Sequence, residues 1–306
     1  MSLESLNRRI KTTQDLGEIV STMKMLSSVS VGQYEKAHQS LNQYAQNIRD
    51  AFHGLFIKDD FQYQEPTLSK TAPKILSIII GTDNGMVGRF NRDLITFTQK
   101  YITNQFDNAT SLVMAVGKRI GLLSNIQKLT VAAAYPMSNS MKELAPMATQ
   151  LLNQINEIVS KNKIDFVYIF ANHKQGNTPF VPRARQLIPL SSERIRQLKQ
   201  SKWDGRSIPL ITLNKNELFS ALLREYFVVV LLHDLVGSLL SEHYTRMIHM
   251  QEAEQNIEES LEEFNLEYQQ LRQEQITDEL IDIVSGAEEM NKQKDQSALD
   301  FSKKKK

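Results

Sequence analysis

Apolar or small residues recur in steps of three and four along both ends of the chain. Near the N-terminus they are Leu3, Leu6, Ile10, Thr13, Gly17, Val20, Tyr34, Ala37, Leu41, Tyr44, Ile48, Phe52 and Leu55. Near the C-terminus they are Leu240, Tyr244, Met247, Met250, Ala253, Ile257, Leu261, Phe264, Tyr268 and Leu271. Alternating steps of three and four are the period of a coiled-coil seam. The pattern predicts one helix over residues 1–57 and another over residues 214–290.

The distribution of proline supports two long helices. All eight prolines lie between Pro66 and Pro209, and a proline inside a helix removes a hydrogen bond and clashes with the preceding turn. Each seam can be buried only against the other or against a partner protein. We expect the chain ends to form an antiparallel coiled coil, with the longer C-terminal helix extending beyond its partner.

The middle of the chain, residues 74–213, alternates strand and helix signals. Strands are expected at residues 74–80, 111–116 and 165–171, with a short one at 131–134. Helices are expected up to residue 104, after Gly117 and over 141–161. Such alternation predicts a right-handed parallel sheet, so the fold class is α/β, with a Rossmann-like middle domain. Residues 180–189 are expected at the edge because of Pro182, residues 191–213 as mostly irregular, and residues 291–306 as a polar, basic tail.

Composition excludes several kinds of function. The 306 residues contain no cysteine, which excludes disulfides, thiolate catalysis and cysteine metal sites. A formal net charge of +1 gives no general case for a nucleic-acid partner. No apolar run approaches the roughly 18 to 20 residues of a membrane span, and the N-terminus resembles neither a signal peptide nor a clear transit peptide.

The glycine-rich segment 81–88 follows a predicted strand and precedes a predicted helix, where a phosphate could bind. Its spacing matches neither a dinucleotide fingerprint nor a Walker loop, so we favour a tight turn over a ligand site. His249 and Glu252 alone have metal-ligand spacing. No nucleophile and base stand out. We therefore expect no catalytic residue, cofactor or metal.

Four segments carry a resemblance to a known family. They read T-M-K-M over residues 22–25, T-D-N-G-M-V-G-R-F-N over 82–91, S-E-H-Y-T-R-M-I-H-M over 241–250, and R-Q-E-Q-I-T-D-E-L-I-D-I-V-S-G-A over 272–287. In this order and over nearly the whole chain, they resemble the gamma subunit of F-type ATP synthase. That family also has coiled-coil ends around an α/β middle.

The resemblance implies a function. The chain is then the central rotor shaft, which transmits torque between a membrane ring of c subunits and a catalytic hexamer of three alpha and three beta subunits. It couples proton or sodium translocation to ATP synthesis or hydrolysis, contacts the epsilon subunit and is not itself an enzyme. Its place is peripheral, on the cytoplasmic side of a bacterial inner membrane.

The resemblance also implies contact residues. Those facing a beta subunit are Arg272, Gln273, Thr277, Glu279, Arg246 and Met23. For Met23 and Met247, plain core packing is an equal alternative. The foot that faces the c-ring falls around Ile211 and Thr212, where the family's aromatic and acidic residues are replaced.

The chain departs from the family at other positions. Residues 27–31 read S-S-V-S-V where the family has a small-residue run ending in basic residues, so a basic contact to the beta subunit's acidic lever is missing. The chain also runs twenty residues past Gly286, where the family usually ends. These departures suggest a divergent branch, such as the alternative, sodium-linked bacterial synthases. Two other hypotheses are a non-rotary coiled-coil adaptor with an α/β head and a nucleotide-binding enzyme.

Overall fold

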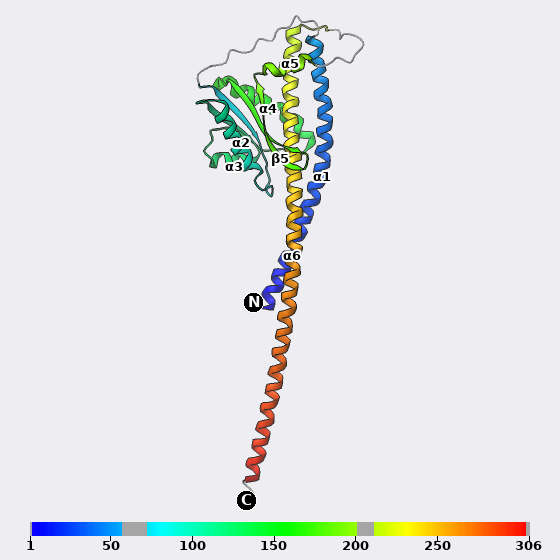
Figure 1. Ribbon diagram of the computed structural model, residues 1–306, viewed down its shortest axis with the longest axis vertical. Coiled ribbons are helices and arrows are strands. Elements are labelled where there is room, and N and C mark those ends of the chain that lie inside the picture. Colours follow the sequence, from blue (N-terminus) through cyan, green and yellow to red (C-terminus); the bar gives the residue numbers. More distant parts are fainter. Residues whose placement is uncertain (1, 57–71, 201–210, 304–306) are drawn as a thin grey trace. The chain divides into compact units, whose positions relative to one another are not determined.

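The computed structural model describes residues 2–56, 72–200 and 211–303 (Figure 1). Its elements are α1 (Leu3–Phe56), β1 (Lys74–Ile80), α2 (Phe90–Gln105), β2 (Thr110–Val116), α3 (Lys118–Ile126), β3 (Val131–Tyr135), α4 (Met141–Asn162), β4 (Phe166–Gln175), β5 (Thr178–Ile188), α5 (Ser192–Gln200) and α6 (Lys215–Lys303). The chain divides into two compact units, residues 24–249 and the paired segments 1–23 and 250–306. The predicted four-part domain division stays a prediction.

The unit of residues 24–249 is built on a five-stranded sheet of order β3-β2-β1-β4-β5. Strands β3, β2, β1 and β4 run parallel, and β5 pairs antiparallel with β4 at the edge. The parallel α/β sheet is therefore confirmed, and Pro182 lies in the edge strand, where its missing donor is tolerated.

Both faces of this sheet are covered, which explains why β1 is almost continuously apolar. Ile75 and Ile79 pack with α2 and α3 on one face. On the opposite face, Leu76, Ile78 and Ile80 pack with α4 and with parts of α1 and α6. Successive strand residues point to opposite faces, so one short strand contributes to two separate cores.

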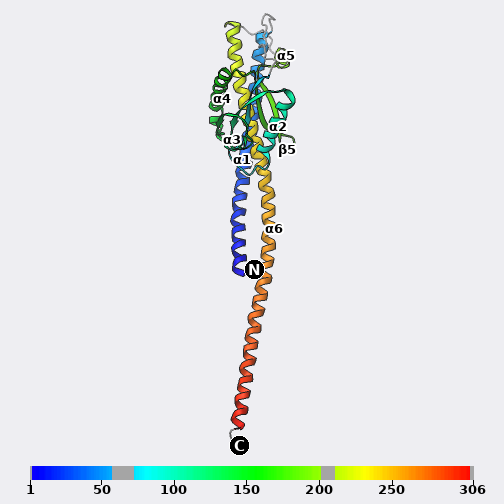
Figure 2. The same cartoon turned by 90° about the vertical axis from the view of Figure 1, so that its left-hand side faces the viewer.

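Within this same unit, α1 and α6 lie side by side and antiparallel (Figure 1 and Figure 2). The rings of Tyr34 and His243 are 5.4 Å apart, and those of Phe52 and Phe219 are 5.9 Å apart. Residues later in α1 therefore face residues earlier in α6. This is the antiparallel arrangement that the two seams predicted. Tyr44 is an exception in the seam: it is 43% exposed, and its hydroxyl donates to a Glu225 carboxylate oxygen at 2.7 Å.

The second unit is also an antiparallel helix pair. The Arg9 guanidinium lies 4.8 Å from the centre of the Phe264 ring. A Cβ added to Gly17 would lie only 3.3 Å from Ile257 Cγ2, so a glycine here lets the two helices approach closely. From Arg272 to Ala287 every residue of α6 is exposed, which confirms that this helix extends beyond its partner.

Two helices differ from expectation. Helix α6 continues to Lys303 instead of ending near residue 290, because residues 291–303 contain neither glycine nor proline to stop it. Helix α5 lies where irregular structure was expected. It starts with a side-chain cap, in which Ser191 Oγ accepts from the Arg194 backbone N–H at 3.2 Å. Residues 201–210 of the same predicted segment lie outside the described residues.

Candidate functional site

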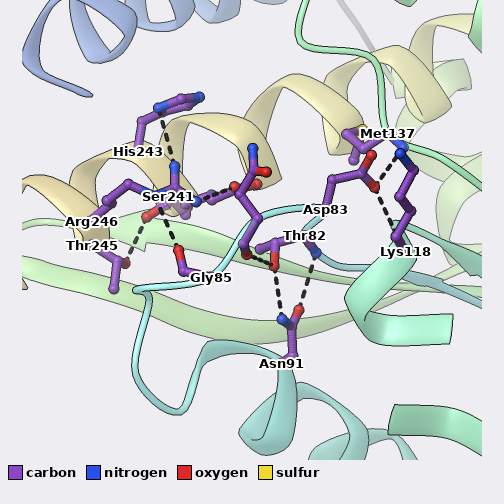
Figure 3. Close-up of polar contacts among 12 residues, drawn as sticks. Thr82, Asp83, Gly85, Asn91, Lys118, Met137, Ser241, His243, Thr245 and Arg246 are labelled. Carbon is purple, nitrogen blue, oxygen red and sulfur yellow. Dashed lines mark hydrogen bonds and ion pairs between the residues drawn. The ribbon is translucent and has the colours of Figure 1, made fainter. Parts of the chain in front are cut away.

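The segment between β1 and α2 is a turn closed by its own side chains (Figure 3). Asn91 Nδ2 donates to Thr82 Oγ1 at 2.8 Å, and the Thr82 backbone N–H donates to Asn91 Oδ1 at 3.1 Å. The Thr82 hydroxyl in turn donates to the Asn84 carbonyl at 2.8 Å. Thr82 and Asn91 are both buried. These bonds occupy polar groups that a phosphate would otherwise use, which fits the tight-turn interpretation.

Asp83 extends this turn to two further elements. Its Oδ1 atom accepts from the Lys118 backbone N–H at 2.7 Å, at the first residue of α3, and from the Met137 N–H at 3.0 Å. A carboxylate at a helix N-terminus satisfies an otherwise unpaired donor and opposes the positive end of the helix dipole. The N-terminus of α3 is thus capped by the chain itself.

The other side of the turn meets α6. Arg246 Nε donates to the Gly85 carbonyl at 3.2 Å, and Arg246 Nη2 donates to Glu242 Oε1 at 2.6 Å. Both charged side chains are almost completely buried. Beside them, Thr245 donates to the Ser241 carbonyl at 2.7 Å (Figure 3). The segments 82–91 and 241–250, which lie far apart in the sequence, therefore form one contact.

Helix α1 reaches the same contact through Tyr34. Its ring stacks on His243, and its hydroxyl donates to the Asn139 carbonyl at 2.8 Å. Burial raises the pKa of Tyr34 to about 12, and the Glu242 carboxylate adds to the shift. Burial lowers the pKa of His243 to about 4, with Arg246 adding to the effect. Burial also raises the pKa of Glu242, against the opposing influence of Arg246.

Gly88 brings the end of the turn close to α6 as well. Its φ of +55° lies in the left-handed region, and an added Cβ would lie 2.9 Å from His249 Nε2. A side chain there would be both strained and obstructed. Hence the glycine-rich composition of segment 81–88 is explained in part by close packing against a helix.

A family model described as ATP synthase matches residues 2–290. The chain belongs to the ATP synthase family. The ATP synthase gamma chain of Geotalea daltonii is 26% identical over 291 residues, which cover 94% of this chain and 98% of that one. The gamma chain of Acetivibrio thermocellus is 24% identical over 293 residues, with 94% and 98% covered.

Solved structures of the family share the fold. A chain of the Euglena gracilis mitochondrial ATP synthase, in rotational state 3, has a TM-score of 0.69 at 16% identity, with 94% of each chain covered. A chain from the central stalk and c-ring of the Tetrahymena thermophila mitochondrial enzyme has a TM-score of 0.53 at 18% identity, covering 77% of this chain and 99% of that one.

Four of the predicted beta-subunit contacts lie on the exposed part of α6. These are Arg272, Gln273, Thr277 and Glu279. Their side chains are accessible from solvent, and the Thr277 hydroxyl donates back to the Gln273 carbonyl at 2.8 Å. Their contact with a beta subunit stays a prediction.

The other predicted contacts are placed differently. Met23 is half-buried on α1, and Met247 is half-buried on α6. Arg246 is buried and bonded within the chain. Ile211 and Thr212 precede Asn214, whose side chain caps α6 by accepting from the Asn216 N–H at 2.9 Å.

Glu242, Asp83 and Asn91 were not among the predicted site residues. The spacing of Glu242 and Arg246, four residues apart on a helix, was a usable signal for an ion pair. No comparable signal links Asp83 to its partners, because these are backbone groups of distant segments.

Two further properties concern the described part of the chain alone. Within it, no three histidine, aspartate or glutamate side chains are grouped so as to hold a metal ion. None of its helices is long and apolar enough to cross a membrane.

Proposed function

We propose that this chain is the central rotor shaft of an ATP synthase. In that role it is non-catalytic and transmits torque between a c-ring and a hexamer of alpha and beta subunits, coupling proton or sodium translocation to ATP synthesis or hydrolysis. The observation that carries the proposal is the exposed segment 272–287 of α6, within a chain that matches the family over residues 2–290.

This exposed segment is too apolar for a helix that faces only water. Its large apolar residues are Ile276, Leu280, Ile281, Ile283 and Val284, which are between 48% and 68% exposed. They fall on one side of the helix, where Ile276, Leu280 and Ile283 follow one another in steps of four and three, and such an apolar stripe is normally packed against protein. A surface of this kind marks an interaction site. A sleeve formed by alpha and beta subunits provides a surface against which this stripe can pack.

Arg272 and Gln273 begin this segment and supply its polar contacts. Arginine presents a planar fork of donors that stays charged, and glutamine offers both a donor and an acceptor. Together with Thr277 and Glu279 further along, they form what we call the polar catch, a group of side chains that hydrogen-bonds to a beta-subunit loop. Met23 remains a candidate contact on α1.

The remaining partners follow from the same role. The epsilon subunit and the c-ring contact the base of the shaft, with Ile211 and Thr212 at the foot. The similar solved structures include an ATP synthase rotor and a central stalk with its c-ring, which supports this assignment. In this role the chain lies peripherally on the cytoplasmic side of a bacterial inner membrane. It binds no nucleic acid and no nucleotide.

Purification of a tagged copy from its own cells tests the proposal. We expect three alpha and three beta subunits for each tagged chain, as measured by native mass spectrometry. A chain that purifies alone or as a homodimer would instead support the coiled-coil adaptor. Calorimetry with ATP and the isolated chain is the second arm, and micromolar binding that is lost when segment 81–88 is changed would favour the nucleotide-binding enzyme.

A further inference from the structure

One face of α6 carries a row of buried polar side chains. Asp234, Ser238, Glu242 and Arg246 follow one another at intervals of four residues, and each is at most 4% exposed. Residues four apart lie on the same face of a helix, and the row spans about 18 Å of helix. All four belong to the unit of residues 24–249.

Three members of the row bind the sheet or the turn that leaves it. Asp234 Oδ2 lies 3.1 Å from Arg185 Nε of β5, and its Oδ1 lies 3.2 Å from His173 Nε2 of β4. The Ser238 hydroxyl donates to the Ile80 carbonyl at the end of β1, at 3.3 Å. Arg246 donates to the Gly85 carbonyl. The fourth member, Glu242, holds the Arg246 guanidinium in place.

The apolar contacts around this row fix the position of α6 on the sheet less sharply than polar contacts do. Val229, Leu231 and Leu235 pack in the same core as Leu76 and Ile78, and burial of apolar surface is non-directional. A hydrogen bond has a defined length and angle. Asp234, Ser238 and Arg246 also lose their partners outside α6 if the helix slides or rotates, which is costly where water cannot replace those partners.

We propose that the row Asp234, Ser238, Glu242 and Arg246 is a polar register that fixes the translation and rotation of α6 against the α/β sheet. On the proposed rotor function, torque that enters through the sheet reaches the coiled coil through this register. Within the register, Arg246 is the residue that positions α6 against the turn at residues 81–88. Its guanidinium therefore serves contacts inside the chain, and the beta-subunit contacts are left to the exposed residues of α6.

A double variant separates this role from a merely structural one. Removing one partner of a buried ion pair leaves the other charge unpaired, but replacing both by apolar residues of similar volume is often neutral for stability. Glu242→Met with Arg246→Leu should therefore fold and assemble, while the Gly85 carbonyl loses its donor. The matched control is Arg89→Gln with Asp93→Gln, an ion pair four residues apart in the same unit whose side chains are 76% and 34% exposed.

The first measurement is hydrogen exchange on the isolated chain. We expect exchange over residues 81–88 to rise at least tenfold in the double variant, with β1 and β4 still protected, and no change in the control. The second is ion transport per ATP hydrolysed by the assembled complex in membrane vesicles. We expect this ratio to fall by half or more, with ATP hydrolysis retained.

A double variant that is as stable, as protected and as tightly coupled as the unmodified chain would overturn the register. If it does not fold, Arg246→Lys decides, because an ammonium group lacks the planar fork that serves Glu242 and Gly85 together. Reduced coupling with Arg246→Lys supports the register, and full coupling refutes it. Failure of the unmodified chain to assemble with alpha and beta subunits would refute the rotor function, whereas the exchange measurement would still test the register.

Discussion

The two units of this chain differ in whether their side chains find their partners within the chain. In residues 24–249, charged and hydroxyl groups such as Asp234, Ser238 and Glu242 are buried and engaged by other parts of the same unit. In the exposed end of α6, apolar groups such as Ile283 and Val284 face solvent. The first unit therefore contains the partners that its folding needs, while the second carries a surface that needs another protein. Changes in the two should differ in whether their effects appear in the isolated chain or only in the complex.

The largest effect on the isolated chain is expected from Phe52→Ala. Phe52 is fully buried and packs against Phe219 and Tyr226 with rings 5.9 and 6.1 Å apart. Removing a buried aromatic ring costs about 3–5 kcal/mol of unfolding free energy, which urea denaturation measures directly. Tyr44→Phe, on the same helix, removes only a hydroxyl from an exposed ring and should cost less than about 1 kcal/mol. Similar losses for both would show that the first unit is not self-contained.

Acid should destabilise the same unit through two histidines. Burial lowers the pKa of His38 to about 4, with the nearby His233 and His173 adding to the shift and Asp234 opposing it. The pKa of His243 is likewise about 4. A proton binds both side chains more readily in the unfolded chain, where the pKa is near 6.5.

Their contribution to stability is therefore complete above pH 6.5 and is lost as the pH falls from 6.5 to 4. The shift from 6.5 to about 4 corresponds to about 3 kcal/mol for each site, and solvent screening of these half-buried side chains reduces the expected loss to about 2 kcal/mol each. Urea denaturation at pH 7.5, 6 and 5 measures the slope. The variant His38→Gln with His243→Gln should show a flatter slope, and an unchanged slope would exclude these two histidines as the cause.

Charges placed in the seam of the other unit should have an intermediate effect. Leu261 and Phe264 are half-buried on α6. Leu261→Asp or Phe264→Asp therefore buries part of an unpaired charge and should lower the free energy of unfolding by about 2 kcal/mol. The yield of assembled complex should fall with it. Glu262→Lys changes an exposed neighbour and should change the yield little. Equal losses from all three would mean that the seam has a different register.

The smallest effect on the isolated chain is expected from Arg272→Ala with Gln273→Ala. Both side chains are exposed, so the unfolding free energy should change by less than about 0.5 kcal/mol. In the complex, lost hydrogen bonds of about 1–3 kcal/mol each should lower ATP turnover or its coupling to ion transport. A double variant that assembles with full activity and full coupling would remove the polar catch from the proposal.

Much of the fold could be predicted from the sequence because its signals are periodic. The steps of three and four identified the buried faces of α1 and α6, and the apolar run at Lys74–Ile80 indicated a strand covered on both sides. The contact between the turn at residues 81–88 and α6 could not be predicted from periodicity. Periodicity shows which face of a helix is apolar, but not that Arg246 meets the carbonyl of Gly85, 161 residues away along the chain. Helix α5 could not be predicted from periodicity because its short segment contains few apolar residues, and Ser191, which caps its first turn, was the available signal.

The edge strand β5 has a consequence for how this protein behaves when many copies are made in one cell. An open sheet edge invites pairing with the edge of another molecule, which leads to aggregation. In β5 the residue opposite Asn172 is Pro182, with Pro179 nearby, and proline is tolerated in a sheet where its missing N–H faces away from the ladder. Pro179 and Pro182 each remove one backbone donor from β5, so a neighbouring strand would pair less well with these positions. Newly made copies that await their partner subunits should therefore pair with one another less readily through this part of β5.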